Sequence, residues 1–412
     1  MRAFFFCAVT AFAASHRIAI WTASTHGPYP SGNPVAQPDL RGILDGPEGA
    51  FNQTFRLIVK PAAMPAEKMR LRFSNVFGTR PVMLDGVYVG LHASAGSIVR
   101  GTNAAVSFNG KSAVTIAPGE LAYSDPVTVK GTGKLAVSFH VAGASGPMTW
   151  HAKAITTSYL SPRNSGSHGR DESSREFPFT TTSWFFLDAI DAVVPCAAPV
   201  VVGFGDSITD GTGSTINGDD RWPDFLAERS GAGFVVLNAG IGGNRVITAT
   251  PAGGPAALER MDRDVLKLPG VTHVIWLEGI NDLGSGASSA DAVIAGFREG
   301  AAKLRARGIK VIGATIVSSL RSTPTHGTPE VDAARKRIND FIRNSGGVFD
   351  GVADFDAATI DAEGALKAEF RPGSSVGGPG DGLHPNRAGY QAMANAIDLK
   401  LLGRSGCATT VR

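Results

Sequence analysis

The sequence predicts an all-β sandwich or jelly-roll domain followed by an open, doubly wound α/β domain. From about residue 50 to residue 190, apolar and polar residues alternate with a period of two, which is typical of half-buried strands. After Pro195, short continuous apolar runs alternate with amphipathic segments. Such runs indicate parallel strands that are covered on both faces by helices. A chain of 412 residues is long enough for two separate cores.

The first half predicts roughly eight or nine short antiparallel strands. Its alternating stretches include FRLIVK, MRLRFSNVFG and KLAVSFHV. The polar residues 163–176 form a long loop that is either functional or disordered, and disorder is expected. In the stretch TWHAKAITTSYL, Trp150 and His151 either face an active site or pack in the sandwich, and the core is the commoner place for a tryptophan. No role for this domain follows from its sequence.

The second half predicts five parallel strands. Their apolar runs are PVVVGFG, GFVVLNAG, VTHVIWLEG, IKVIGATIV and GVFDGVADF. Amphipathic segments separate the runs, and a last helix over residues 387–403 closes the domain. In open sheets of this kind the active site lies at the carboxyl ends of the strands, so these ends are where catalytic side chains are expected.

Residues 1–14 have the layout of a secretory signal peptide, with one Arg and then apolar residues from Ala3 to Ala14. A buried first strand is the alternative. We therefore expect a β domain over 18–194, an α/β domain over 195–412, and a secreted or periplasmic protein. After export, Cys196 and Cys407 are expected to form a disulfide that ties the ends of the second domain together, and two unpaired thiols are the alternative.

Composition excludes several kinds of partner and cofactor. A net charge of +3 without a basic block disfavours nucleic acid, and no later apolar run is long enough to cross a bilayer. The nine histidines are scattered without an H-E-x-x-H motif, which indicates no metal. GFGDSI lacks the third glycine of a dinucleotide-binding loop, so no cofactor is expected. The oligomeric state is left open.

The stretch GFGDSITDG places Ser207 in a glycine-bounded turn at the end of the first predicted parallel strand. A serine hydroxyl becomes a nucleophile only when a base removes its proton. The alternative is a serine that caps a helix. Thr209 stands where G-x-S-x-G would require its second glycine, which argues against an α/β-hydrolase.

Three other strand-end loops carry possible partners for this serine. In DGLHPN, Asp381 and His384 are three residues apart, so a helical start would bring both side chains to one side. The carboxylate could then orient an imidazole that takes the serine proton, although Asp381 could instead cap the last helix. The glycines of NAGIGGN and the amide of Asn281 in GIND could bind an oxyanion. Turn geometry and an Asx-turn are the alternatives.

GDSITDG, NAGIGGN, GIND and DGLHPN occur in this order, and residues 199–403 thereby resemble the SGNH hydrolases, or GDSL esterase/lipase superfamily. The resemblance implies a flavodoxin-like three-layer α/β/α sandwich. It also implies the roles of the site residues. Ser207 is the nucleophile, His384 the base and acid, and Asp381 the residue that orients His384. The oxyanion hole comprises the Ser207 N–H, the Gly243 N–H and the Asn281 amide, with Gly243 chosen by its offset from Asn238. Asp206, Asn244 and Arg245 are expected beside them.

The first half is similar, more loosely, to that of two-domain secreted GDSL-type esterases. Together these features predict a secreted, metal-independent serine esterase. By analogy, we expect short-acyl substrates, including O-acetyl groups on carbohydrate. The alternatives are a lipase or arylesterase, and a carbohydrate-binding protein with an inactive hydrolase domain. The stretch Asp219–Trp222 either lines the substrate mouth or is an Asp-capped helix start.

Overall fold

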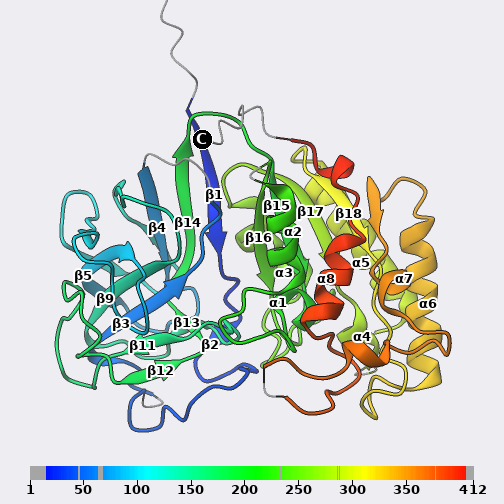
Figure 1. The fold of residues 1–412 in the computed structure, drawn as a ribbon, viewed down its shortest axis with the longest axis horizontal. Coiled ribbons are helices and arrows are strands. Elements are labelled where there is room, and N and C mark those ends of the chain that lie inside the picture. Colours follow the sequence, from blue (N-terminus) through cyan, green and yellow to red (C-terminus); the bar gives the residue numbers. More distant parts are fainter. Residues whose placement is uncertain are drawn as a thin grey trace, which may run out of the picture.

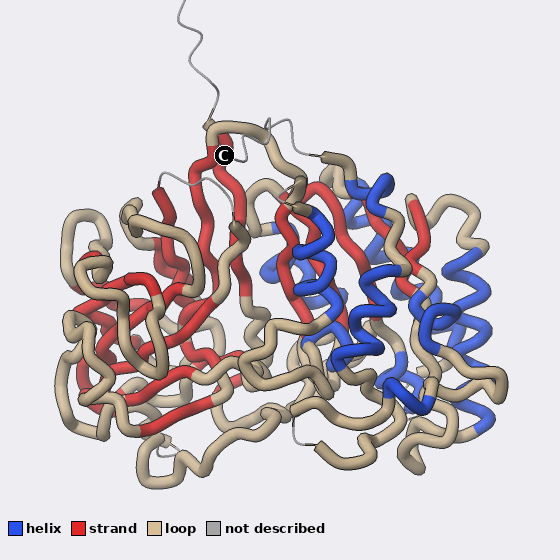
Figure 2. Tube along the Cα trace, viewed as in Figure 1, coloured by secondary structure: helices blue, strands red, loops and turns tan. Residues whose placement is uncertain are grey.

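A computed structural model describes residues 15–44, 47–63, 68–231, 233–284, 286, 288–375 and 377–404. The expected signal peptide at residues 1–14 lies outside these residues. Figure 1 shows two parts that lie side by side, and Figure 2 shows that the helices are confined to the part that contains the later residues. The earlier part is all-β, as the alternation predicted.

The β domain contains antiparallel sheets. One has the order β1-β14-β4-β8, a second β12-β11-β3-β9-β5-β6 with β7 paired to β5, and a third β13-β10-β2. The bounds are β1 His16–Thr22, β2 Gly27–Pro28, β3 Phe51–Val59, β4 Lys68–Ser74, β5 Val82–Leu91, β6 Ala104–Ala105, β7 Ala113–Ile116, β8 Leu121–Tyr123, β9 Leu135–Ala144, β10 Thr149–His151, β11 Ser158–Leu160, β12 Phe179–Thr181, β13 Trp184–Phe185 and β14 Leu187–Val194. The described strands thus exceed the eight or nine expected, because several are only two or three residues long.

Aromatic packing joins the sheets of the β domain. Phe55 of β3 stacks on Phe139 of β9, with ring centroids 5.3 Å apart. Phe73 of β4 meets Phe139 edge-on at 5.4 Å, and Phe186 meets it at 6.1 Å. All four rings are fully buried. Their burial accounts for the period-two alternation, because each strand directs every second side chain into this core.

The expectation of disorder for residues 163–176 is wrong. The structure describes this loop throughout, and the buried guanidinium of Arg56 holds it from the sheet. Arg56 Nη1 donates to the carbonyl oxygen of Ser173 at 3.1 Å, and Nη2 donates to that of Asp171. Arg56 Nε also donates to Ser138 Oγ at 2.8 Å. A polar loop can be ordered in this way because a buried cation supplies donors for its carbonyl groups.

The α/β domain has a five-stranded parallel sheet in the order β16-β15-β17-β18-β19. Its strands are β15 Val200–Gly205, β16 Val235–Gly240, β17 Val271–Leu277, β18 Lys310–Ala314 and β19 Gly351–Ala353. The helices are α1 Ser207–Asp210, α2 Trp222–Ser230, α3 Ala257–Met261, α4 Ile280–Gly284, α5 Ala290–Arg305, α6 Pro329–Arg343, α7 Phe355–Thr359 and α8 Arg387–Asn395. Three short helical turns complete it, namely η1 Asp262–Leu266, η2 Ala368–Phe370 and η3 Leu399–Leu402. This confirms the predicted flavodoxin-like layers.

Successive residues of these strands enter different cores, which explains their continuous apolar runs. Val201 packs in a cluster with Trp222 of α2 and Tyr390 of α8. Val202 belongs to the other cluster, which includes Phe297 of α5 and continues into the β domain. Because β15 lies between β16 and β17, the chain leaves its end at the point where the strand order reverses, and this is where open α/β sheets bind ligands.

The last helix is shorter than predicted. It ends at Asn395, and residues 399–402 form a separate 3₁₀ turn. The side chain of Asp398 caps this turn by accepting a hydrogen bond from the N–H of Lys400 at 3.0 Å. An Asp that caps a new turn competes with continuation of the helix. In the described part of the chain, no helix is both long and apolar enough to span a membrane.

The two domains are in direct contact. Strand β1 packs beside β16, and the N–H of Ala19 donates to the carbonyl oxygen of Pro269 at 2.8 Å. Between β14 and β15 the chain passes from one domain to the other within residues 195–199. Of the described residues there, Cys196 is disulfide-bonded. Cys407 lies outside the described residues, so its pairing with Cys196 stays a prediction.

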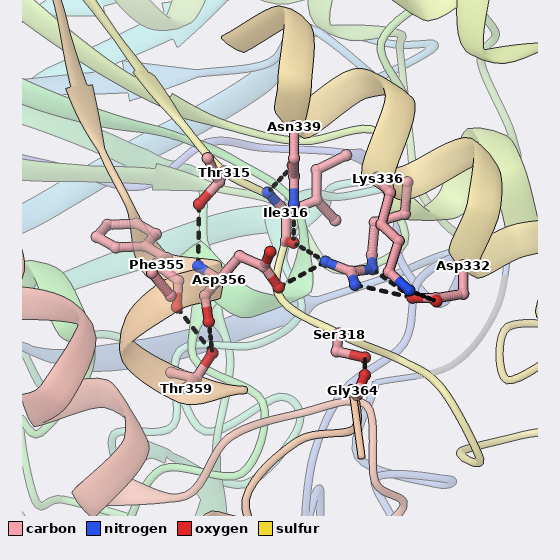
Figure 3. Close-up of polar contacts among 12 residues, drawn as sticks. Thr315, Ile316, Ser318, Asp332, Lys336, Asn339, Phe355, Asp356, Thr359 and Gly364 are labelled. Atoms are coloured by element: carbon pink, nitrogen blue, oxygen red, sulfur yellow. Dashed lines mark hydrogen bonds and ion pairs between the residues drawn. The ribbon is translucent and has the colours of Figure 1, made fainter. Parts of the chain in front are cut away.

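A buried ion network fixes the loop that follows β18 (Figure 3). Arg335 of α6 donates from Nη1 to Asp356 Oδ1 at 2.6 Å and to the carbonyl oxygen of Ile316 at 2.9 Å. Its Nη2 reaches Asp332 Oδ1 at 2.8 Å. Asn339 also binds Ile316 through both its amide oxygen and its amide nitrogen. The guanidinium is fully buried. The network therefore links α6 and α7 to the loop after β18 in the interior of the domain.

We expect Arg335→Met to lower the free energy of unfolding by about 3 kcal/mol, because Asp332 and Asp356 lose the buried cation that they share and keep only the more exposed Lys336 and Arg343. The measurement is chemical denaturation followed by circular dichroism. The matched control is Arg337→Met on the same helix, whose side chain is 63% exposed and pairs with Asp291 at the surface. An exposed pair contributes at most about 1 kcal/mol. Equal losses in the two variants would contradict this account of the network.

Candidate active site

Ser207 is the first residue of α1, directly after the carboxyl end of β15. Asp206 caps the helix, and its Oδ1 accepts a hydrogen bond from the N–H of Ile208 at 3.0 Å. The turn is tight because Gly205 carries no side chain, since a Cβ there would lie 2.1 Å from the carbonyl oxygen of Leu277. Ser207 is therefore not the capping residue, and its hydroxyl is left to other partners.

His384 and Asp381 lie beside this hydroxyl. Ser207 Oγ is 2.8 Å from His384 Nε2, and His384 Nδ1 is 2.6 Å from Asp381 Oδ2. The other carboxylate oxygen, Oδ1, accepts the N–H groups of Leu383 and His384, each at 2.9 Å. Burial by itself raises the pKa of Asp381, but the bonds and charge of His384 and the two N–H groups hold it well below its usual range. Asp381 is thus a fixed carboxylate.

Asp381 and His384 are brought together by a loop, and the helical start we expected is absent there. The helix α8 begins only at Arg387. Asn386 caps it by accepting the N–H groups of Ala388 and Gly389 at 3.0 and 3.1 Å. The alternative role for Asp381 as a helix cap is therefore wrong. Its carboxylate forms an Asx-turn instead, which directs both side chains to one side.

The backbone after β16 distinguishes Gly243 from the other glycines of NAGIGGN. The N–H of Gly240 is bonded to Asn238 Oδ1 at 2.9 Å and that of Gly242 to Asp210 Oδ2 at 2.7 Å. Within the described residues, the N–H groups of Gly243 and Ser207 have no hydrogen-bond partner. Gly243 has a φ of +77°, a conformation that favours glycine. These two N–H groups are the donors still available at the strand ends.

Asn281 lies on α4 at the end of β17, and its amide nitrogen donates to the carbonyl oxygen of Asn244 at 2.9 Å. Asn244 is itself fixed by three hydrogen bonds. Its Nδ2 donates to the carbonyl oxygens of Gly253 and Pro255, both at 2.7 Å, and its Oδ1 accepts from Arg260 Nε at 2.7 Å. Asn244 therefore joins the turn that carries Gly243 to the helix that carries Asn281.

The part of the chain that carries these groups is similar to a known family. Residues 204–392 match the GDSL-like lipase/acylhydrolase family. The α/β domain belongs to this family. The protein is accordingly a carboxylic ester hydrolase, as the four sequence blocks predicted.

Solved structures similar to the GDSL domain are remote in sequence. A GDSL-like lipase from Bacteroides thetaiotaomicron is 20% identical with a TM-score of 0.36, over 49% of this chain and 87% of that chain. The aryl esterase of M. smegmatis is 16% identical with a TM-score of 0.40, over 50% and 100%. A lipolytic G-D-S-L family protein from Veillonella parvula is 18% identical with a TM-score of 0.37, over 48% and 96%. No curated protein matches the chain.

Asp206 and Arg245, which were also expected beside the site, lie in different surroundings from each other. Asp206 is buried beneath Ser207, where burial and the nearby Asp282 carboxylate raise its pKa to about 7. Arg245 is half-buried, and its Nη1 donates to Thr248 Oγ1 at 3.3 Å. No contact among the described residues joins Arg245 to Ser207 or His384. In that part of the chain, no cluster of three or more His, Cys, Asp and Glu side chains could hold a metal ion.

The segment Asp219–Trp222 does not line a substrate mouth through Trp222. This ring is fully buried against Phe355, with centroids 5.4 Å apart. The expected Asp cap is also wrong, since Arg221 is the capping residue. Asp220 Oδ1 accepts the N–H of Thr215 at 2.8 Å instead, so the carboxylate satisfies the preceding loop and is not available to the helix.

Sequence analysis missed Arg260, the buried cation of the GDSL domain behind the site. Its Nη2 donates to the carbonyl oxygen of Gly205 and its Nη1 to that of Ala239, both at 2.8 Å. It thereby joins the ends of β15 and β16. Glu278, at the end of β17, lies 3.9 Å from Arg260 Nη2 and accepts Trp276 Nε1 at 2.8 Å. An Arg in an amphipathic segment gives no sequence signal that its guanidinium will be buried.

Trp150 and His151 of the β domain have different surroundings. Trp150 packs edge-on against Tyr29 and nearly parallel to Phe185, so it belongs to the core of its own domain. His151 Nε2 lies 3.1 Å from Asp210 Oδ1, and its Nδ1 is bonded to the carbonyl oxygen of Ser24 at 2.7 Å. His151 therefore contacts the GDSL domain through α1.

Burial raises the pKa of Glu278 from its ordinary value of 4.5 to about 8. Between these values the folded protein holds a proton that the unfolded chain has lost, so stability falls as pH rises, by about 1.4 kcal/mol per unit. We expect Glu278→Gln to remove the contribution of Glu278, while the contribution of Asp206 below pH 7 remains. Urea unfolding of both proteins from pH 5.5 to 8 measures it, with the exposed Glu299→Gln as control. Parallel curves for wild type and Glu278→Gln would show that Glu278 is ionised throughout.

Proposed function

We propose that the protein is a serine esterase that works through an acyl-enzyme on Ser207. The observation that carries the proposal is the continuous hydrogen-bonded chain from Ser207 Oγ through His384 to Asp381, with separations of 2.8 and 2.6 Å. A nucleophile, a base within reach and a carboxylate that orients the base are the three parts that such catalysis needs. The chain lies at the carboxyl end of β15.

His384 transfers protons in both halves of the reaction. As Ser207 Oγ attacks the ester carbonyl carbon, its proton passes to His384 Nε2. The alkoxide of the substrate then leaves with that proton, and an ester between Ser207 and the acyl group remains. Water repeats the sequence to release the acid. Asp381 stays ionised throughout because its pKa is held low, so it stabilises the imidazolium and fixes which ring nitrogen carries the proton.

Three donors face the oxygen that becomes negative in each step. They are the N–H groups of Ser207 and Gly243 and the side-chain amide of Asn281. The accounting of hydrogen bonds in the 238–244 turn supports Gly243, and the bond to Asn244 fixes the orientation of Asn281. Donors held in place before the reaction stabilise the oxyanion without reorganisation, and each typically contributes a hundred- to thousand-fold in rate.

We extend the proposal to short-acyl esters, including O-acetyl groups on carbohydrate, by analogy with secreted GDSL esterases. A lipase or arylesterase would use the same Ser207, His384 and Asp381. The two classes therefore differ only in the groups that the site accepts on either side of the ester.

We expect Ser207→Ala to abolish hydrolysis of p-nitrophenyl esters, and Asp381→Asn to lower kcat by about 10⁴-fold because the imidazole adopts the wrong tautomer. A series from acetyl to palmitoyl, assayed with chelator present, measures both this loss and the preferred acyl length. The control is Asp398→Asn, remote on the turn after α8. Full activity in Ser207→Ala would refute the mechanism, and a maximum at long acyl chains would refute the short-acyl proposal. Release of acetate from O-acetylated xylan would distinguish carbohydrate esters.

We also propose export, which the disulfide state of Cys196 supports, since disulfides persist mainly in oxidising compartments. Expression with the complete chain in a secreting bacterial host is expected to yield a product in the medium that lacks the residues of the expected signal peptide. Mass spectrometry of non-reduced peptides is expected to find Cys196 joined to Cys407. A full-length product retained in the cytoplasm, with both thiols free, would contradict the proposal.

A further inference from the structure

A segment of the β domain lies across the part of the hydrolase domain that carries Ser207. The segment comprises residues 151–157 and starts at the last residue of β10. His151 contacts Asp210 of α1. The carbonyl oxygen of Ala154 accepts a hydrogen bond from Arg221. The carbonyl oxygen of Ile155 accepts the N–H of Asn217 at 2.9 Å. Both partners belong to the loop that follows α1, so the two domains share one polar interface here.

Lys153 extends from this segment toward the turn that carries Gly243. It is buried, with 4% of its surface exposed, and its Nζ donates to Thr212 Oγ1 at 2.7 Å. A Cβ on Gly242 would lie 2.5 Å from this Nζ and 2.4 Å from Asn33 Oδ1, another β-domain atom. Gly242 thus leaves the space that the ammonium group occupies. The ammonium lies directly against the backbone next to Gly243.

The same turn is also held by Asp210, whose Oδ2 accepts the Gly242 N–H at 2.7 Å. Burial alone raises the pKa of Asp210, but His151 and Lys153 together lower it below its usual value. Asp210 is therefore a buried carboxylate that depends on two side chains of the β domain. Removing the charge of Lys153 would weaken the support for the carboxylate that holds Gly242.

Charged groups surround Lys153 on several elements. Asp206 and Asp210 at α1 and Asp381 before α8 favour its charged form, whereas Arg221 before α2 disfavours it. The positive charge of Lys153 also contributes to lowering the pKa of His26 in the β domain. Burial is the largest effect, and it lowers the pKa of Lys153 below its ordinary 10.5 despite the acids.

We propose that Lys153 is a positioning residue for ester hydrolysis, which holds the Gly242–Gly243 turn in register with Ser207 and supplies positive charge behind the oxyanion. On this proposal the β domain contributes to catalysis through Lys153. This inference rests on the proposed serine mechanism. The physical reason is that a fixed cation in a site with little water favours negative charge that develops nearby, while the Asp210 bond keeps the Gly243 N–H directed at that charge.

Two reactions test this inference. We expect Lys153→Met to lower kcat for p-nitrophenyl acetate by about 10- to 100-fold with KM changed less than about twofold, because only the transition state carries the oxyanion. The second reaction uses a fluorophosphonate. Ser207 Oγ forms a bond to phosphorus, fluoride leaves, and His384 takes the serine proton. The rate of labelling is expected to fall by a similar factor, since the phosphoryl oxygen enters the same hole.

The matched control is Lys134→Met. Lys134 is another β-domain lysine that forms an ion pair across the interface, 2.8 Å from Asp219, yet it does not contact the 238–244 turn. It is expected to keep wild-type kcat. Equal losses in the two variants would show that domain docking alone matters and would overturn the positioning role.

The pH dependence separates charge from packing. In wild type, kcat is expected to decline on the alkaline side at a pH below 10.5 as Lys153 loses its proton, and this decline is expected to be absent in Lys153→Met. If the Met variant does not fold, Thr212→Val removes only the acceptor of Nζ. It is expected to slow labelling severalfold while the alkaline decline remains. Wild-type labelling rates in whichever variant folds, or identical alkaline profiles in wild type and Met variant, would overturn the inference. Absence of labelling of wild-type Ser207 would instead overturn the serine mechanism itself.

Discussion

The site depends on the close approach of three strand ends, which glycine permits. At Gly205 a side chain would strike the carbonyl oxygen of Leu277 on β17, and at Gly240 it would lie 2.2 Å from the backbone nitrogen of Asp210 in α1. Because side chains are absent at these two positions, α1 can begin directly at the end of β15, between the ends of β16 and β17. Ser207 is thereby placed within hydrogen-bond distance of His384, which lies on a loop 177 positions later in the chain. The proposed nucleophile, base and oxyanion donors converge because backbone packs on backbone there.

Such close packing buries backbone carbonyl groups at the strand ends, and Arg260 supplies hydrogen-bond donors to two of them. Its guanidinium binds the carbonyl oxygens of Gly205 and Ala239 together with the side chain of Asn244. A buried Arg can do this because its five N–H groups are arranged as a rigid fork. The cost is a buried charge, which Asp264 offsets at 3.2 Å. The ends of β15 and β16 and the Asn244 turn are therefore fixed by one side chain that touches none of the reacting atoms.

The sequence was most informative where local pattern and tertiary environment agree. The five apolar runs correspond to β15–β19, because a strand covered on both faces must be apolar throughout. Ser207, His384, Asp381 and Asn281 could be predicted as site residues because their short motifs lie at strand ends. Arg335 and Arg260 could not be found in this way, since an amphipathic helix shows which face is apolar but not that a cation on it will be buried among carbonyl groups. Order in residues 163–176 depends on Arg56, more than 100 positions earlier, and nothing local in that loop records it.

The contribution of the β domain was the least accessible to sequence reasoning, and physical argument explains why. Lys153 and Asp210 would each be unfavourable as a buried charge in a domain considered alone, because an unpaired charge away from water is costly. They are compatible only when both domains are present, since the ammonium group comes from one domain and the carboxylate from the other, and His151 adds a contact to that carboxylate. Separating the domains would expose a network built for a dry interface and would release the turn that Asp210 holds. The polar composition of this interface therefore couples the integrity of the Gly242–Gly243 turn to the docking of the β domain. Apolar packing alone would hold the two domains together without linking them to the proposed catalytic groups.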